Sequence, residues 1–362
     1  MKYIDEFRNS RLIRRLFGKI KAESADQPVN IMEVCGTHTQ SFRHFALSGL
    51  LPQNLRLISG PGCPVCVSQE SFIDSAIELS RRKDTIILTF GDMLRIPGTK
   101  STLEKESGNS ADIRVVYSCW DALKVARANT SKRAVFLAVG FETTAPTVAL
   151  TILQAAKEKI GNISFLCALK LIPPAMLYLL KDRRLNLSGF LCPGHVSTII
   201  GAKAYLPIVN NYHIPCCVAG FEPLDILEGL LILLRDINAK RARITNEYRR
   251  AVRTNGNLKA QHLISSVFRK EGAVWRGLGL IPQSGLVIRK EYSRFDTAKI
   301  FSFKLQTPNS KLPTKCRCAE VLKGLILPPE CRLFGGECTP DNPIGTCMVS
   351  SEGACNVYYR YR

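Results

Sequence analysis

The sequence predicts an α/β protein with two parallel-sheet domains of the βαβ type and a smaller third domain that is mostly helical or irregular. Three observations support this prediction. Short apolar, β-branched runs alternate with helix-like stretches along much of the chain. The 362 residues exceed what a single hydrophobic core usually organises. The C-terminal segment changes to a coil that is rich in glycine, proline and cysteine.

The strand and helix signals follow one another in a regular order. The predicted strands are residues 29–34, 55–59, 85–90, 113–117, 134–140, 163–169, 188–192 and 214–219. The helix-like stretches between them include residues 69–83, 122–129, 146–159 and 173–181. This alternation is typical of βαβ units, in which successive strands are parallel. A longer helical pattern runs from about residue 223 to 248, and the sequence after it is more irregular.

We expect three domains from this order. The first covers residues 27–125, the second covers residues 126–235, and the third combines residues 236–362 with the N-terminal residues 1–26. Functional loops of open parallel sheets lie at the carboxyl ends of the strands. The glycine-containing segments that follow the predicted strands are therefore the expected location of a site.

Composition and charge exclude several classes of protein. The N-terminus is charged and lacks the apolar core of a secretory signal, and the most apolar stretch, residues 226–234, is too short to cross a bilayer. We therefore expect a cytoplasmic protein that does not associate with membranes. The formal net charge is +20, but the basic residues are scattered and are not interleaved with aromatic residues. A solvated surface or a face for an acidic partner protein is favoured over binding to nucleic acid.

The fourteen cysteines point to metal or redox chemistry, because structural disulfides are rare without export. Cys35 follows the first predicted strand, and Cys63 and Cys66 follow the second in a Gly-Pro-Gly-Cys-Pro-Val-Cys segment. A thiol between a strand end and a helix N-terminus meets free N–H groups and the positive end of the helix dipole, which favour the thiolate. The Cys-x-x-Cys spacing is typical of thiol exchange, with a zinc half-site as the alternative.

A second group of thiols lies near the C-terminus. Cys331, Cys338, Cys347 and Cys355 can together hold zinc or an iron–sulfur cluster. The close Cys-x2–4-Cys knuckles of structural zinc are absent, so the wide, uneven spacing favours a cluster. Upstream lie two more thiols, Cys316 and Cys318, which are candidates for a ligand or a nearby redox group. We expect the remaining thiols to be core residues; they are Cys119, Cys167, Cys192, Cys216 and Cys217.

Three further residues are candidates for the site. His38 and His195 lie in glycine-containing loops at predicted strand ends, where a role in the site is favoured. Glu142 lies in a similar loop and is a candidate base or supporting carboxylate. Capping of the helix that follows is an equally simple explanation for Glu142.

Together these segments resemble the HypD family of NiFe-hydrogenase maturation proteins. The resemblance covers nearly the whole chain, and its motifs are residues 35–38 (Cys-Gly-Thr-His), 60–66, 91–95 (Gly-Asp-Met-Leu-Arg), 140–144 (Gly-Phe-Glu-Thr-Thr), 193–197 (Pro-Gly-His-Val-Ser) and 347–355. It implies two α/β domains and a third domain with a 4Fe–4S cluster. It also implies a scaffold that acts with a small HypC-type chaperone, on which iron receives cyanide and carbon monoxide ligands. HypE, with HypF, would provide the cyanide.

The resemblance assigns roles to single residues. Cys35 would bind the iron of the Fe(CN)2CO unit together with the partner's N-terminal cysteine, and His38 and His195 would flank this iron. The Cys63/Cys66 pair would be redox-active, and the four cysteines from Cys331 to Cys355 would hold the cluster. The family's usual pattern is not followed everywhere, since members commonly have proline where this chain has Gln69.

The implied function is that of an accessory protein for metallocentre assembly rather than of a conventional enzyme. Two other classes stay open at this point. One is a stand-alone iron–sulfur-dependent disulfide reductase, which would reduce the Cys63–Cys66 pair and then a protein substrate. The other is a zinc-containing protein that binds nucleic acid, which the charge and the four C-terminal cysteines suggest.

Overall fold

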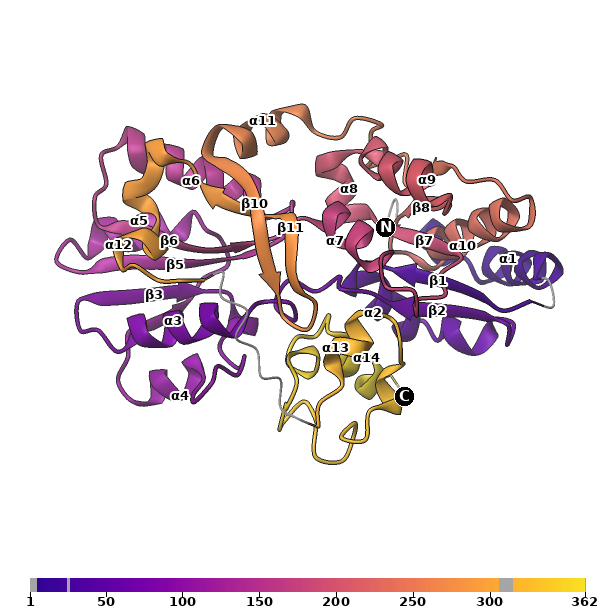
Figure 1. Ribbon diagram of the computed structural model, residues 1–362, viewed down its shortest axis with the longest axis horizontal. Coiled ribbons are helices and arrows are strands. Elements are labelled where there is room, and N and C mark those ends of the chain that lie inside the picture. The colour runs from indigo at the N-terminus through magenta and orange to yellow at the C-terminus, as the bar shows by residue number, and fades with distance from the viewer. Residues whose placement is uncertain (1–4, 25–26, 306–314, 362) are drawn as a thin grey trace.

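Two parallel β-sheets form the framework of the protein. The computed structural model describes residues 5–24, 27–305 and 315–361. The first sheet has the strand order β2-β1-β7-β8-β9 and the second has the order β4-β3-β5-β6. An antiparallel hairpin, β10-β11, runs between the two lobes, and the C-terminal segment lies beside them (Figure 1). The prediction of an α/β fold built on parallel sheets is confirmed.

The strand bounds agree closely with the apolar runs of the sequence. The first sheet contains β1 (Val29–Glu33), β2 (Leu55–Ser59), β7 (Gly189–Pro193), β8 (Cys216–Ala219) and β9 (Ile244–Asn246). The second contains β3 (Thr85–Thr89), β4 (Ile113–Val115), β5 (Arg133–Gly140) and β6 (Ile163–Leu169), and the hairpin contains β10 (Phe268–Trp275) and β11 (Gly279–Ile288). Every strand pair within the two sheets is parallel, so all carboxyl ends of one sheet lie at the same edge.

Helices cover both faces of each sheet. They are α1 (Ser10–Glu23), α2 (Gly36–His44), α3 (Glu70–Ser80), α4 (Leu103–Gly108), α5 (Asp121–Ala128), α6 (Ala145–Lys157), α7 (Ile172–Leu179), α8 (Gly194–Ile200), α9 (Leu206–Tyr212), α10 (Pro223–Asn238), α11 (Leu258–Val267), α12 (Thr297–Ile300), α13 (Cys318–Leu322) and α14 (Ala354–Arg360). Short 3-10 turns include η1 (Asp5–Arg8) and η7 (Thr346–Met348). None of the described helices has the length and apolar character needed to cross a membrane.

The core is layered as the period of a β-strand requires. On β3, Ile86 and Leu88 face a hydrophobic layer shared with α5 and α6, whereas Ile87 faces the opposite layer shared with α3. Successive side chains of a strand point to opposite faces, so a strand covered on both sides is apolar throughout. Burying each such side chain stabilises the fold by about 1.5–3 kcal/mol.

The strand pairing differs from the predicted division of the chain. The first sheet takes β1 and β2 from the N-terminal part and β7, β8 and β9 from residues 189–246, while the second takes the strands between them. Residue 125 therefore lies inside a βαβ unit of the second sheet rather than between two domains. The local strand pattern predicts each strand but does not specify its neighbour in the sheet.

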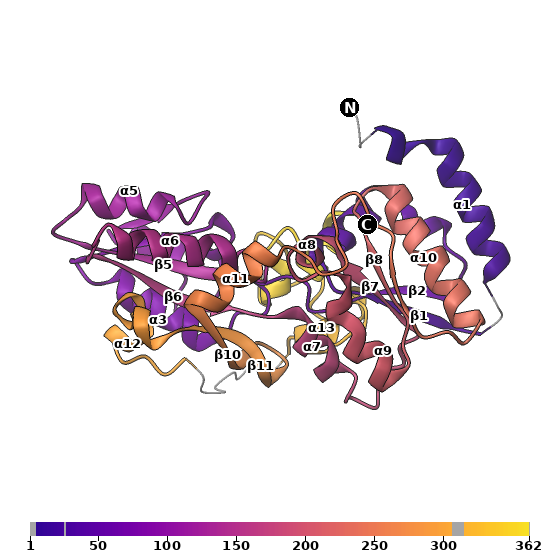
Figure 2. The same cartoon turned by 90° about the horizontal axis from the view of Figure 1, so that it is seen from above.

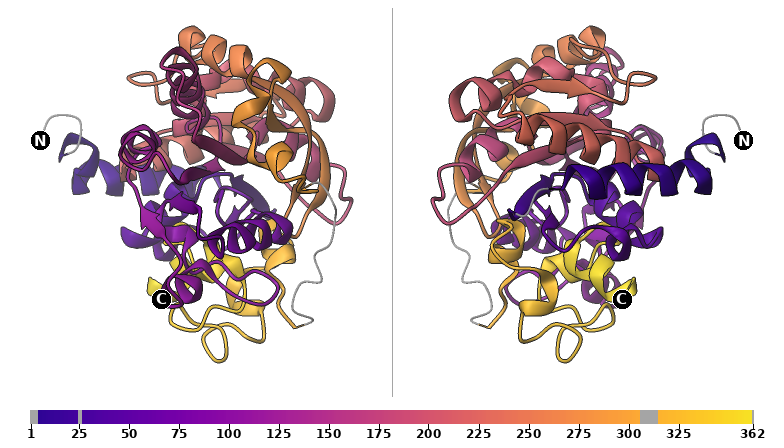
Figure 3. Two further views of the ribbon diagram at one scale, coloured as in Figure 1. Left: turned by 90° about the vertical axis from the view of Figure 1, so that its left-hand side faces the viewer. Right: turned by 90° about the vertical axis from the view of Figure 1, so that its right-hand side faces the viewer.

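The N-terminal and central segments also pack differently from the prediction. Helix α1 packs against α10 of the first sheet, with Leu16 and Ile20 buried in their common layer, and not against the C-terminal cysteines (Figures 2 and 3). The chain from α11 to α12 packs mainly on the second sheet, where Phe268 and Phe295 are buried. The described part of the C-terminal cysteine segment comprises residues 315–361.

Lys170, at the end of β6, is buried between the second sheet and the hairpin. Its Nζ donates to the side-chain oxygen of Gln69 at 3.0 Å and to the backbone oxygen of Val274 at 2.7 Å. Gln69 is therefore a partner of a buried amine. Burial lowers the pKa of Lys170 from its ordinary 10.5 to about 7.

We expect Lys170→Met to flatten the pH dependence of stability at alkaline pH. The unfolded chain binds a proton at Lys170 up to about pH 10.5, and the folded protein binds it only up to about pH 7. The free energy of unfolding of the wild type therefore falls as the pH falls from about 10.5 to 7, by several kcal/mol at most. Urea denaturation over this pH range measures the effect. The exposed Lys157→Met variant is the control, and parallel curves for wild type and Lys170→Met would contradict the assignment.

Candidate metal and thiol site

The carboxyl edge of the first sheet collects most of the predicted site residues. Strand β1 leads into Cys35, β2 leads into the loop of Cys63, and β7 leads into His195. Strand β8 lies between β7 and β9 and leads into Phe221. Because the strands are parallel and adjacent, these loops lie side by side although they are far apart in the sequence.

Cys35 and the loop of Cys63 are in direct backbone contact. Cys35 is the extended residue that precedes α2, and the N–H of the next residue, Gly36, donates to the backbone oxygen of Gly62 at 3.2 Å. A Cβ atom on Gly62 would lie 2.3 Å from the backbone nitrogen of Cys35, so only glycine allows this approach. The contact places Cys35 beside the residue that precedes Cys63.

Cys63 and Cys66 are joined by a disulfide, with their Cα atoms 5.3 Å apart. The N–H of Cys66 also donates to the sulfur of Cys63 at 3.2 Å. Both residues are buried, Cys63 being 3% and Cys66 0% exposed. The structure thus holds the pair as a disulfide, and its burial limits which molecules can reach the two sulfurs.

Burial dominates the acidity of Cys35. It raises the pKa of this thiol to about 12, and the carboxylate of Glu352 adds to the rise, against weaker opposing hydrogen bonds from His38 and Thr37. The N–H groups at the start of α2 lower the pKa of Cys35, as expected, but the cost of burying the charge is larger, so the protein alone favours the protonated thiol. A bound metal cation displaces the thiol proton, so metal binding at Cys35 releases a proton.

The C-terminal segment contacts both cysteine loops. The hydroxyl of Thr37 donates to the carboxylate of Glu352 at 2.8 Å, and a Cβ atom on Gly36 would lie 2.4 Å from the backbone oxygen of Glu352. The hydroxyl of Thr346 donates to the backbone oxygen of Cys66 at 2.8 Å. Thr346 and Glu352 flank Cys347 and were not singled out from the sequence. Their position within the C-terminal cysteine motif is the signal that points to them.

The C-terminal cysteines surround a small cavity in the same segment. Its wall includes five thiols, which belong to Cys316, Cys318, Cys331, Cys338 and Cys355. In the part of the chain that the structure describes, no three His, Cys, Asp or Glu side chains are grouped closely enough to hold one metal ion together. A cluster carries one thiolate on each of its irons and needs sulfurs distributed over several walls of a cavity. The all-thiol donor set of this wall therefore fits an iron–sulfur cluster.

The thiols of this segment form a chain of contacts that includes Cys318. The Cys318 thiol interacts with those of Cys316 and Cys347, and the Cys347 thiol interacts in turn with that of Cys355. The hydrogen bond with Cys318 lowers the pKa of Cys347, but the contact with Cys355 and burial outweigh it, so this pKa lies well above its ordinary value. Spacing alone did not decide the place of Cys318, and the structure includes it in the same group.

His38 and His195 both contact the aromatic ring of Phe221. The ring of Phe221 is 4.7 Å from that of His38 and 4.0 Å from that of His195, centroid to centroid. The Nε2 atom of His38 contacts the backbone oxygens of Gly220, at 2.8 Å, and Ala219, at 3.3 Å. Two carbonyl neighbours require a proton on Nε2, so the lone pair is on Nδ1. Nδ1 is buried and has no hydrogen-bond partner among the described residues, which leaves it available to a ligand.

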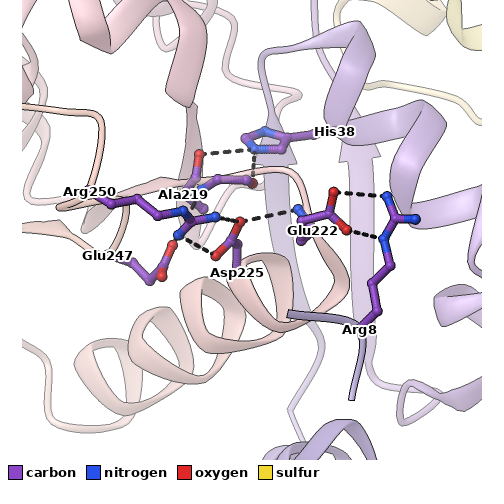
Figure 4. A network of polar contacts seen from close by, with 8 residues as sticks. Arg8, His38, Ala219, Glu222, Asp225, Glu247 and Arg250 are labelled. Atoms are coloured by element: carbon purple, nitrogen blue, oxygen red, sulfur yellow. Dashed lines mark hydrogen bonds and ion pairs between the residues drawn. The ribbon is translucent and has the colours of Figure 1, made fainter. Parts of the chain in front are cut away.

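A network of charged groups holds the loop of Phe221 in place (Figure 4). Asp225 is fully buried and forms two hydrogen bonds with Arg250, at 2.8 and 2.5 Å, and it also accepts from the N–H of Glu222 at 3.2 Å. Arg8 pairs with the carboxylate of Glu222 at 2.5 Å. The N–H of Gly220 donates to Glu247 at 3.3 Å. These contacts fix both ends of the loop whose Phe221 ring contacts the two histidines.

Arg250→Ala is expected to destabilise the protein by roughly 3 kcal/mol, because it leaves the buried carboxylate of Asp225 without its partner. Chemical denaturation at neutral pH measures the change. Adding Asp225→Asn should recover part of the loss, since the amide carries no uncompensated charge. The control is Arg249→Ala, an exposed neighbour that pairs with no carboxylate in the described chain and should change stability by less than about 0.5 kcal/mol. Equal stabilities of the Arg250 and Arg249 variants would contradict this account.

Glu142 lies at the carboxyl end of the second sheet. Its carboxylate accepts from the N–H of Ile172 at 3.0 Å, so it caps α7 rather than the helix that directly follows it in the sequence. Burial raises the pKa of Glu142 to about 7, and its second oxygen has no hydrogen-bond partner in the described residues. The structure thus places Glu142 with α7, while His38 and His195 lie around Phe221 of the first sheet.

The cysteines predicted to be core residues are mostly buried. Cys119, Cys192, Cys216 and Cys217 are buried, and Cys167 is half-buried against the hydrophobic layer of the second sheet.

The chain matches the family model described as HypD, hydrogenase formation hypA family, over residues 11–362. It is 45% identical to the hydrogenase expression/formation protein HupD of Azotobacter chroococcum, over 100% of this chain and 97% of the relative. It is 42% identical to the hydrogenase maturation factor HypD of Cupriavidus necator, over 100% of this chain and 97% of the relative. The HypD of Escherichia coli is 41% identical, over 100% of this chain and 98% of the relative.

Proposed function

The chain belongs to the HypD family, and we propose from this premise that it is a maturation factor that serves as a scaffold for the iron centre of NiFe-hydrogenase. With a small HypC-type partner it would hold an iron ion while the ion receives cyanide and carbon monoxide. HypE, with HypF, would supply the cyanide. The iron is the cargo of this process, and thiols and histidines of the protein would bind or contact it.

The observation that carries the proposal is the meeting of three cysteine-bearing segments at one place. The loop of Cys35 contacts the loop of Cys63 through Gly36 and Gly62, at 3.2 Å. The C-terminal cysteine segment contacts the first loop through Glu352 and the second through Thr346, both at 2.8 Å. A metal-binding thiol, a disulfide and a set of candidate cluster ligands are thus neighbours, which is the arrangement that redox-assisted assembly on iron requires.

Cys35 is the proposed iron ligand. Its thiolate is a soft donor, which suits low-spin iron with cyanide and carbonyl ligands. The partner's cysteine would supply a second thiolate, and burial of Cys35 would shield the iron from water. His38 offers a lone pair on Nδ1 near this loop, and the stack with Phe221 and His195 keeps its ring in one orientation.

Cys331, Cys338, Cys347 and Cys355 are the proposed holders of a 4Fe–4S cluster. Three of them line the small cavity together with Cys316 and Cys318, and Cys347 is connected to that group through its contacts with Cys318 and Cys355. When bound, such a cluster supplies electrons one at a time. Two electrons and two protons convert the Cys63–Cys66 disulfide to two thiols. A short path connects the proposed cluster ligand Cys347 to the disulfide. It runs along the backbone from Cys347 to Thr346 and then through the hydrogen bond from the Thr346 hydroxyl to the backbone oxygen of Cys66.

The burial of the disulfide favours the scaffold over a stand-alone disulfide reductase. A reductase that acts on proteins needs an accessible sulfur for the mixed disulfide, and Cys63 and Cys66 are 3% and 0% exposed. A buried pair is suited instead to electron transfer toward a neighbouring group, such as iron at Cys35.

Anaerobic co-purification with the small partner tests the proposal. We expect acid-labile sulfide to report the cluster and total iron to exceed that sulfide, because the extra iron is the cargo. Iron and sulfide in equal amounts, from cells that supply the ligands and contain an active partner, would favour the reductase. Zinc in place of iron would overturn both functions.

A further inference from the structure

A groove without any acidic lining residue borders the edge of the first sheet. It consists of two adjoining cavities of about 870 and 580 Å³ that share Arg253 and Thr254 in their walls. The wall is formed by Thr198 and Ile199 of α8, by residues 243–246 and 249, and by residues 251–259. We call it the β9 groove, because all three residues of β9 contribute to it. It takes no part in the site described above.

The charged side chains that line the β9 groove are all positive. Among the residues that the structure describes, its wall contains Arg243, Arg249, Arg253 and Lys259 and no aspartate or glutamate. Arg243 pairs with Asp236 at 2.9 Å, whereas the other three cations form no ion pair within the described residues. The positive end of α11, which starts at Leu258, adds to the same potential. Uncompensated cations in a concave surface attract a negatively charged partner and steer its approach.

The backbone that carries these cations is firmly anchored. The N–H groups of Ala202 and Lys203 donate to the backbone oxygens of Arg253 and Thr254, at 3.3 and 3.1 Å. A Cβ atom on Gly256, which has a φ of +69°, would lie 2.3 Å from the backbone oxygen of Ile199, so this close approach needs glycine. The backbone that carries the arginines is therefore fixed before a partner binds, which lowers the entropy cost of binding that partner.

An unpaired strand edge runs along the groove. Strand β9 pairs with β8 on one side and has no strand on its other side in the described chain. In a parallel strand alternate residues direct their N–H and C=O groups to one side, so on β9 the groups of Ile244 and Asn246 face away from β8. The backbone oxygen of Asn246 accepts from Nε of Arg249 at 3.2 Å, which leaves the two groups of Ile244 and the N–H of Asn246 to pair with another strand. Leu258, which is 65% exposed, supplies an apolar surface in the same groove.

We propose that the β9 groove binds an acidic, extended segment of a partner protein, which adds to the first sheet as a strand beside β9. The outer backbone groups of β9 would give the affinity, and Arg249, Arg253 and Lys259 would select acidic side chains. An apolar side chain of the segment would lie on Leu258. Nucleic acid is disfavoured because no aromatic residue lines the groove to stack on a base. The inference does not depend on the proposed function.

The groove is linked to the candidate site through α8. The helix starts beside His195 and ends near Thr198 and Ile199 of the groove wall. A partner segment bound there would hold its protein next to the loops of Cys35 and Phe221 without occupying them. The groove therefore offers an anchoring point for a protein that delivers or receives cargo at the site.

Fluorescence anisotropy with labelled seven-residue peptides tests the proposal on the full chain. The probe peptide is Glu-Val-Glu-Leu-Glu-Val-Glu. One control peptide has lysine in place of every glutamate. A second control has proline in place of both valines, so that the peptide loses two backbone N–H donors. We expect only the first peptide to bind, more weakly as salt rises, and Arg249→Glu with Arg253→Glu to weaken it by at least roughly tenfold.

The matched control is Arg14→Glu with Arg15→Glu, which makes the same change in net charge on the exposed face of α1 and should leave binding unchanged. Equal losses in the two double variants, or no loss in either, would overturn the proposal. If the wild-type protein bound the proline peptide as tightly as the probe peptide, strand addition would be excluded. Tighter binding of a single-stranded oligonucleotide, lost in the groove variant, would replace the peptide with nucleic acid as the ligand.

Discussion

Replacing Cys347 by alanine is expected to remove the iron–sulfur cluster entirely. Cys347 is fully buried, and its thiol contacts those of both Cys318 and Cys355, so it lies at the centre of the C-terminal thiols. Without this thiolate one iron of the cluster would lack its ligand. Visible absorption and the sulfide content of anaerobically purified protein measure the loss.

Cys119→Ala is the matched control, since Cys119 is 2% exposed but lies in the hydrophobic layer of the second sheet. It should keep a full cluster. Retention of the cluster in Cys347→Ala would contradict the proposed ligand set. Two further variants, Cys318→Ala and Cys331→Ala, distinguish the possible sets of four cluster ligands. The proposed set includes Cys331 but not Cys318, so only Cys331→Ala should lose the cluster.

Cys35→Ala is expected to have the opposite effect, with the cluster retained and the additional iron lost. Cys35 contributes the proposed thiolate of the cargo iron and lies outside the C-terminal thiols. Total iron should fall to the level of the sulfide, with unchanged visible absorption of the cluster. Mössbauer spectroscopy of protein enriched in ⁵⁷Fe separates the two kinds of iron.

Cys192→Ala is the control for this variant. Cys192 is a fully buried thiol on the neighbouring strand β7, so its removal tests the general effect of losing a core thiol near the site. It should leave both kinds of iron in place. Loss of the additional iron in Cys192→Ala, or its retention in Cys35→Ala, would show that Cys35 is not the ligand.

The strands of the two parallel sheets were predictable because their local pattern is strong. The runs at residues 55–59 and 163–169 match β2 and β6 in the structure. Strands that are covered on both faces are apolar at nearly every position, so their bounds are set by the polar residues and glycines beside them. The same pattern predicted site loops at the strand ends, but it did not predict that β7 joins β1 and β2, which brings His195 to the edge of Cys35 and Cys63.

The strand β9 and the hairpin were not predicted. The helical pattern expected to reach residue 248 ends with α10 at Asn238, and β9 is a strand of only three residues, Ile244–Asn246. In the hairpin, a register shift between Glu271 and Ala273 interrupts the alternation of apolar and polar residues. Short or irregular strands are stabilised by their neighbours and leave little local signal.

Contacts between segments that are far apart in the chain could likewise not be predicted from the sequence. Thr37 and Glu352 form one hydrogen bond although 315 residues separate them, and no periodic pattern connects the two. The high pKa of Cys35 has the same origin, because burial by the rest of the chain outweighs the helix N-terminus that the sequence reveals. Local residues thus indicated which groups belong to the site, and the packing of the chain determines how they interact.

The infrared spectrum of the anaerobically co-purified complex with its small partner tests the central claim most directly. An iron ion that carries cyanide and carbon monoxide has stretching bands in a region where proteins do not absorb. We predict these bands for the wild type, a shift of the cyanide bands on labelling with ¹³C-cyanide precursors, and their absence in Cys35→Ala. Bands of unchanged intensity in Cys35→Ala, or none in a wild-type complex that supports hydrogenase maturation in the same cells, would contradict a scaffold built on Cys35.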